Sequence, residues 1–107
     1  MSRSDAERVA DILDAARELA DAVAVGHDDF VTSLLRTRAA ERLLEIIGEA
    51  SNRLSAEFTD AHPKVPWSDV VALRILLAHH YHRVDVEQVW KIATSSVPDL
   101  VRHLGVG

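Results

Sequence analysis

The sequence predicts an all-α fold, a single-domain helical bundle of about five helices over residues 1–107. Apolar residues recur at the three- and four-residue spacing of helices, and no segment shows the alternation of a strand. The few glycines and prolines fall mostly between the periodic segments. A chain of 107 residues forms one small domain with a small core, whose stability can depend on a partner subunit.

The first helix is predicted over residues 5–25. Ser4 and Glu7 have capping-box spacing at its start, and Gly26 suits the position after its last turn. Its apolar positions share one helical face: Val9, Ile12, Leu13, Ala16, Leu19, Ala20 and Val23.

The second helix is predicted to begin at Asp28 and Asp29, where acidic side chains meet the positive end of the helix dipole. Thr32-Ser33 is expected to break or bend it early. Its clearest apolar stripe consists of Ala40, Leu43, Leu44, Ile47, Ala50 and Leu54. Gly48 costs about 1 kcal/mol inside a helix. We expect another helix to approach closely at this position, where a side chain is missing.

Residues 59–67 are predicted to form a loop with two prolines. Ser68 and Asp69 then lead into a third helix, which is apolar on most sides and is therefore expected to be central. The histidine-rich stretch from His79 to His82 should end it.

A fourth helix is predicted after Asp85, which has Gln88 at capping-box spacing. Four apolar residues should face inward: Val86, Val89, Trp90 and Ala93. Ser96 is expected to cap a last short helix, with Pro98 tolerated in its first turn and Gly105 closing it.

Composition excludes several function classes. The absence of cysteine rules out a disulfide framework, a thiol nucleophile and a cysteine-based zinc site, and it fits a reducing cytosol. We find no signal peptide and no apolar run that spans a membrane, so the protein is expected in the cytoplasm. The net charge of −5 argues against a surface that coats nucleic acid broadly.

Charge is uneven along the chain, however. Residues 62–83 contain three cationic side chains, Lys64, Arg74 and Arg83, against a single acid, Asp69. Four of the six histidines also lie there: His62, His79, His80 and His82. An electropositive pocket on an acidic protein is compatible with this pattern.

Arg74 is the most informative residue of this region, because it lies within the most apolar predicted helix. A buried unpaired guanidinium is costly. No acid lies one turn away on either side, which excludes a local helical ion pair. Arg74 therefore requires a distant partner, an exposed face or an anionic ligand.

His79 follows Arg74 by five residues, about 140° and roughly 7.5 Å along an ideal helix. The two converge on one ligand only where the helix ends, or across a two-fold axis between two copies. Together they suit cleavage of RNA, which carries its own nucleophile, the 2′-OH. A histidine moves the proton and an arginine holds the phosphate, without a metal. This spacing alone also occurs by chance in many helices.

The chain resembles HEPN-domain ribonuclease toxins of the HepT-like family, also described as domain of unknown function 86. Residues 41–54, ERLLEIIGEASNRL, resemble the family's second-helix signature, and residues 66–90 resemble its core segment. That segment carries the family's Arg-x4-His-x-Tyr motif at Arg74, His79 and Tyr81. The resemblance covers nearly the whole chain.

The resemblance implies a metal-independent endoribonuclease that acts as the toxin of a toxin–antitoxin pair and needs no cofactor. It implies a homodimer with the Arg74 and His79 motifs lining a cleft between protomers. The implied partner is a minimal nucleotidyltransferase antitoxin, which would neutralise the toxin by transferring AMP from ATP onto Tyr81. A bulky anion there would occupy the cleft and repel the RNA phosphate.

Two positions depart from the family pattern. Ile75 stands where asparagine is common, and isoleucine cannot orient the arginine or bind phosphate. His80 stands where an acid is frequent, which raises the local positive charge. His80 and His82 are accessory site candidates, although surface histidines are usually only solvated. The alternative function is a catalytically inactive HEPN module that binds nucleotide, RNA or its nucleotidyltransferase partner. A plain structural helical dimer is the third hypothesis.

Structural interpretations stand beside these functional ones. Arg74 could pair with a distant acid, and Tyr81 could be a half-buried aromatic. His79 and His82 have a spacing that binds metal, but no third ligand stands out. Trp67 and Trp90 are interpreted as core or dimer-interface anchors.

The second predicted helix carries three arginines, Arg36, Arg38 and Arg42. Three interpretations stand open: they form a solvated face, they pair with Glu41 and Glu45, or they bind RNA phosphates.

Overall fold

A computed structural model describes residues 3–78 and 85–105 of the chain. Its regular elements are all helical: α1 (Arg3–Val23), α2 (His27–Val31), α3 (Leu34–Asn52), α4 (Ala56–Asp60), α5 (Trp67–Ala78), α6 (Val86–Lys91), the π-helical turn η1 (Ile92–Ser96) and α7 (Val97–His103). The predicted all-α fold is confirmed. No helix in the described ranges is long and apolar enough to cross a membrane.

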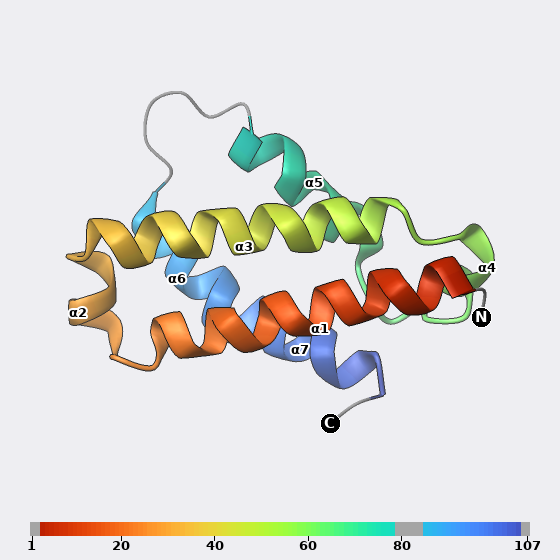
Figure 1. The fold of residues 1–107 in the computed structure, drawn as a ribbon, viewed down its shortest axis with the longest axis horizontal. Coiled ribbons are helices and arrows are strands. Elements are labelled where there is room, and N and C mark those ends of the chain that lie inside the picture. Colours follow the sequence, from red (N-terminus) through yellow and green to blue (C-terminus); the bar gives the residue numbers. More distant parts are fainter. Residues whose placement is uncertain (1–2, 79–84, 106–107) are drawn as a thin grey trace.

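The two long helices, α1 and α3, lie side by side and antiparallel, joined at one end by α2 (Figure 1). Gly26 makes the turn before α2 with a φ of 95°, a conformation that suits glycine. The side chain of Ser33 caps α3 by accepting a hydrogen bond from the backbone N–H of Arg36, at 3.2 Å. The predicted break at Thr32-Ser33 is therefore confirmed.

The core lies where α1 and α3 face the C-terminal helices. Six of its side chains have no exposed surface: Ile12, Leu19, Phe30, Ala40, Leu44 and Ile47. Full burial of one large aliphatic side chain contributes about 1.5–3 kcal/mol. This cluster therefore supplies much of the free energy of folding.

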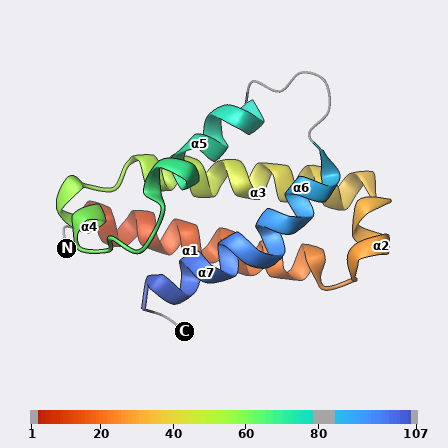
Figure 2. The same ribbon diagram turned by 180° about the vertical axis from the view of Figure 1, so that it is seen from behind.

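α6, η1 and α7 follow one another without interruption and cross the face of α1 and α3 that is turned toward the viewer in Figure 2. Asp85 caps α6 as predicted, because its Oδ1 accepts from the backbone N–H of Glu87 at 3.0 Å. The prediction that Ser96 caps a separate last helix is wrong: its backbone is helical and its side chain makes no capping hydrogen bond. Here the apolar face continues through Ala93, Val97 and Leu100, and burial of that face favours an unbroken helix.

Two further sequence predictions are wrong: the start of the first helix and the loop at residues 59–67. α1 begins at Arg3, so Ser4 lies inside the helix and not before it. The predicted loop at residues 59–67 is preceded and partly replaced by the short helix α4, capped by Ser55, which accepts from the backbone N–H of Phe58 at 3.1 Å. The buried Asp5 in turn accepts from the backbone and hydroxyl of Ser55, at 2.9 and 2.6 Å. Asp5 thus holds Ser55, the residue that caps the start of α4, in place.

The expectation that the third helix is central is also wrong. α5 packs chiefly on α3 and lies on the outside of the bundle (Figure 1). None of its described side chains is fully buried, and Ile75 and Leu76 are 51% and 38% exposed. An apolar helix need not be central if one of its faces has no partner within the same chain.

Candidate active site

α3 and α5 touch backbone to backbone at Gly48. A Cβ atom at Gly48 would lie 2.7 Å from the backbone nitrogen of Arg74, 3.2 Å from its Cβ and 3.1 Å from the carbonyl oxygen of Val70. Contacts below 3.0 Å are too short for any side chain, so only glycine permits this separation. The predicted close approach of another helix is confirmed, and the helix that approaches is the one that carries Arg74.

Arg74 itself is half-buried in this crossing. Its Nε is buried and donates no hydrogen bond to any described residue, and the same holds for the buried Oγ of Ser51, one turn after Gly48 on α3. A buried donor without a partner costs about 1–3 kcal/mol. Arg74 also makes no ion pair within residues 3–78 and 85–105. Among these residues, the interpretation of Arg74 as one half of a structural ion pair finds no support.

The other predicted site residues are His79, His80, Tyr81 and His82, and all four lie outside the described residues. α5 leads directly into them, since it ends at Ala78. Their assignment to catalysis, accessory roles, modification or metal binding stays a prediction. In the described ranges, no three histidine or carboxylate side chains are grouped as metal ligands.

The exposed face of α5 lies mostly on the side of the helix opposite Arg74. Ala72, Ile75 and Leu76 are exposed there, and together they form an apolar strip along the helix. Ile75, which stands where the family commonly has asparagine, points largely into solvent. Its side chain offers no hydrogen bond to Arg74.

Two arginines of α3 pair within their own helix. Arg38 donates to both carboxylate oxygens of Glu41 at 3.2 Å, and Arg42 is hydrogen-bonded to Glu45. The interpretation that they pair with these acids is confirmed. Such exposed pairs contribute at most about 1 kcal/mol each.

Both tryptophans pack against the core. This confirms their interpretation as core anchors. Trp67 donates its indole N–H to the carbonyl oxygen of His62 at 3.0 Å, which ties the start of α5 to the preceding loop. Trp90 lies against Phe30, with ring centroids 5.5 Å apart. Neither indole therefore needs a partner subunit to be half-buried.

Sequence reasoning missed a polar cluster between α2 and α6. The Nε2 of His27 lies 2.7 Å from Oε1 of Glu87, and its Nδ1 lies 2.8 Å from Oδ1 of Asp28. The hydrogen bond to Glu87, and then that to Asp28, raises the pKa of His27 above its usual value. Glu87 lies far along the chain, so no local signal indicates this contact.

One known family matches most of the chain. The family model described as "Ribonuclease HepT-like" matches residues 12–106. The chain belongs to the HepT-like ribonuclease family. No solved structure matches significantly.

Several curated relatives of this HepT-like chain cover most of its length. A protein of Methanocaldococcus jannaschii named "Putative RNase" is 32% identical over 99% of both chains. A "Probable ribonuclease HepT" of Thermococcus cleftensis is 34% identical over 94% of this chain and 92% of its own. A second "Putative RNase", from Caldanaerobacter subterraneus, is 38% identical over 75% of this chain and 71% of its own.

Proposed function

We propose that this protein is a metal-independent endoribonuclease that acts as the toxin of a toxin–antitoxin pair. One observation carries the proposal: Arg74 is held at the Gly48 crossing with a buried Nε that has no partner in the described residues. An arginine placed in this way is suited to bind an anion from outside the chain. Family membership and the names of the relatives identify RNA as the proposed substrate.

In the proposed reaction, the 2′-oxygen of one nucleotide attacks the adjacent phosphorus while the bond to the 5′-oxygen breaks. The proton leaves the 2′-OH and a proton reaches the departing 5′-oxygen, and His79 performs one of these transfers. Arg74 binds the phosphate oxygens, whose charge increases in the transition state. The products are a 2′,3′-cyclic phosphate and a 5′-OH.

A two-fold homodimer completes the proposed site. The apolar strip of Ala72, Ile75 and Leu76 is exposed on the same helix that carries Arg74. Pairing of two such strips would bury apolar surface and bring the two α5 helices, with their copies of Arg74 and His79, to one interface. We propose that a nucleotidyltransferase antitoxin neutralises this cleft by attaching AMP to Tyr81.

Cleavage of total RNA in the presence of EDTA tests the catalytic proposal. We expect the unmodified protein to cleave RNA, and His79→Ala to abolish cleavage. Arg74→Lys should reduce it by about tenfold or more, because lysine cannot bind phosphate bidentately. Arg17→Lys is a control matched to Arg74→Lys, since this exposed arginine lies on α1 and not on α5. Cleavage that requires added metal, or that survives His79→Ala, would contradict the proposal.

The inactive HEPN module is the second candidate, and Ile75 is the observation that favours it. Ile75 is half-exposed beside Arg74 and provides no hydrogen bond where related proteins commonly have asparagine. If the folded, unmodified dimer fails to cleave RNA, Ile75→Asn should create the activity. Activity of the wild-type protein rules this candidate out.

A further inference from the structure

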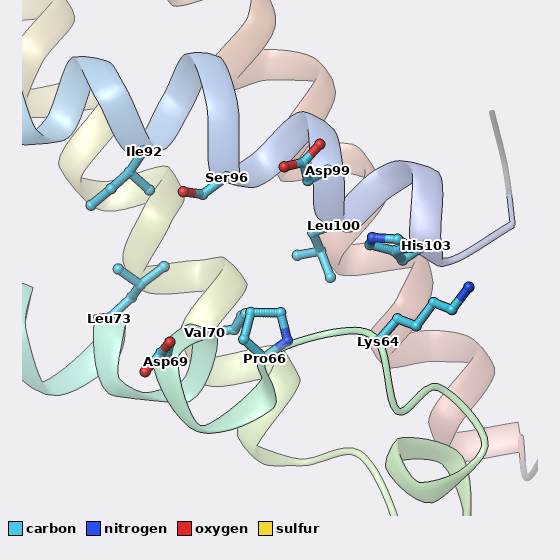
Figure 3. A pocket seen from close by; sticks show the side chains of 10 residues that line it. All are labelled: Lys64, Pro66, Asp69, Val70, Leu73, Ile92, Ser96, Asp99, Leu100 and His103. Carbon is cyan, nitrogen blue, oxygen red and sulfur yellow. The ribbon is translucent and has the colours of Figure 1, made fainter.

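A cleft of about 360 Å³ lies between α5 and the C-terminal helices, and Arg74 is not among the residues that line it (Figure 3). One wall is formed by α5 and the loop before it, the other by η1 and α7. We call it the α5–α7 cleft. Its apolar lining includes Val70 and Leu73 from one wall and Ile92 and Leu100 from the other. Its volume falls within the range of small-molecule sites.

A basic hollow of about 250 Å³ adjoins this cleft, and Lys64 and His103 line both. Figure 3 shows these two side chains at the same end of the cleft, one on each wall. His62 also lines the hollow, and none of the described residues that line the hollow is acidic. This is unusual for a protein with a net charge of −5.

Two of the side chains that line the hollow are not used by the fold. Lys64 and His103 make no ion pair or hydrogen bond within the described ranges. The Nδ1 of His62 lies 3.0 Å from the carbonyl oxygen of Phe58, so Nδ1 is the donor and Nε2 is its remaining polar atom. The His62 ring stacks on Phe58 at 4.3 Å, which fixes its orientation. The hollow therefore presents a positioned imidazole together with an ammonium group.

Two carboxylates also line the cleft. Asp69 lies on the α5 wall and makes no ion pair with a described residue, while Asp99, one turn before His103 on α7, is paired with Arg102. Carboxylates accept hydrogen bonds from hydroxyl or amino groups. Ile92 and Ser96 also reach the cleft from the π-helical turn η1. π-helical turns are rare and frequently occur at functional sites.

We propose that the α5–α7 cleft and the hollow beside it bind a small phosphate ester with a partly apolar body, such as a nucleoside monophosphate. The phosphate lies among Lys64, His62 and His103, and its three terminal oxygens accept more hydrogen bonds than the two of a carboxylate. The Lys64 ammonium donates to them, and His62 donates from Nε2 in its imidazolium form. The ring of the ligand covers Val70 and Leu73, and Asp69 accepts from its hydroxyl or amino groups. This site is separate from Arg74 and does not depend on the proposed ribonuclease activity.

Calorimetric titration of the intact protein with AMP tests the proposal. We expect saturable binding, competition by inorganic phosphate, and at least tenfold weaker binding of adenosine, which lacks the phosphate. Lys64→Gln should weaken AMP binding by about tenfold or more, since it removes a charged hydrogen-bond donor. Lys91→Gln is the matched control: Lys91, the other lysine of the chain, lines neither the cleft nor the hollow. It should leave the affinity unchanged.

Three results would overturn the proposal. The first is no binding of AMP to the folded protein. The second is binding that Arg74→Gln abolishes but Lys64→Gln leaves intact, which would assign the ligand to the Arg74 site. The third is Lys64-dependent binding of a 2′-O-methylated oligoribonucleotide without binding of AMP, which would assign the hollow to an RNA strand.

Discussion

Helices α3 and α5 pack against each other, yet the more apolar of the two is the less buried. α3 carries charged residues throughout, but Ala40, Leu44 and Ile47 on it have no exposed surface. α5 has only two charged residues, Asp69 and Arg74, and none of its described side chains is fully buried. α3 is therefore the structural centre of the bundle. α5 is a surface helix, and we propose that its exposed apolar residues form the dimer interface.

The difference in burial between α3 and α5 explains the position of Arg74. α3 supplies a rigid, buried surface, and Gly48 lets the α5 backbone rest directly on it. α5 holds its arginine at this contact and exposes the opposite side. Arg74 thus belongs to the exposed helix α5, but contact with the buried helix α3 fixes its position.

Truncation of the α3 core should have the largest effect on stability. We expect Leu44→Ala to lower the free energy of unfolding by about 2–5 kcal/mol, because it removes buried methyl groups and leaves a cavity. Ile75→Ala on the exposed face of α5 should cost the monomer no more than about 0.5 kcal/mol. Urea unfolding at low protein concentration measures both. Equal losses would contradict the assigned roles of the two helices.

Gly48→Ala tests the contact between the helices. Its Cβ would meet the backbone of Arg74 at 2.7 Å, so α5 must shift. We expect a loss of about 1–3 kcal/mol, as for other overpacked sites, and reduced RNA cleavage from displacement of Arg74. Glu49→Ala on the exposed side of α3 is the control and should stay within about 0.5 kcal/mol. Wild-type stability and activity of Gly48→Ala would show that α5 is not held at this point.

Leu76→Glu tests whether the exposed strip of α5 is a dimer interface. A carboxylate buried opposite its own copy should raise the dimer dissociation constant at least about tenfold, equal to about 1.4 kcal/mol. Sedimentation velocity measures the change, with Leu35→Glu, at a more exposed leucine of α3, as the control. A dimer that persists in Leu76→Glu and dissociates in Leu35→Glu would move the interface to the start of α3.

The smallest expected effect concerns His27, which links α2 to α6. Its pKa is raised in the folded state by Glu87 and Asp28, so its stabilising contribution is complete below the ordinary histidine pKa and is lost as pH rises through the folded-state value. We expect the free energy of unfolding of the wild type to fall as the pH rises above the ordinary histidine pKa of about 6.5. His27→Gln should show a smaller fall. An unchanged pH dependence would exclude this link.

Sequence patterns predicted the features that depend on neighbouring residues. The break at Thr32-Ser33 and the cap at Asp85 follow from side chains that bond to the backbone a few residues away. α4 was missed although Ser55 and Glu57 give it a cap and an acidic first turn, because two prolines nearby favoured a loop. The start of α1 before Ser4 shows the limit of capping patterns at a helix end.

The sequence by itself determined the helical class, the position of most helices, the need for close contact at Gly48 and the family resemblance. These follow from periodicity and motif spacing, which are local properties. Only the tertiary structure decided that α5 is external, that α6, η1 and α7 are continuous, and that Lys64 and His103 share one hollow. An apolar helix face must be covered by other apolar residues. The tertiary structure determines whether those residues come from the same chain or from another one.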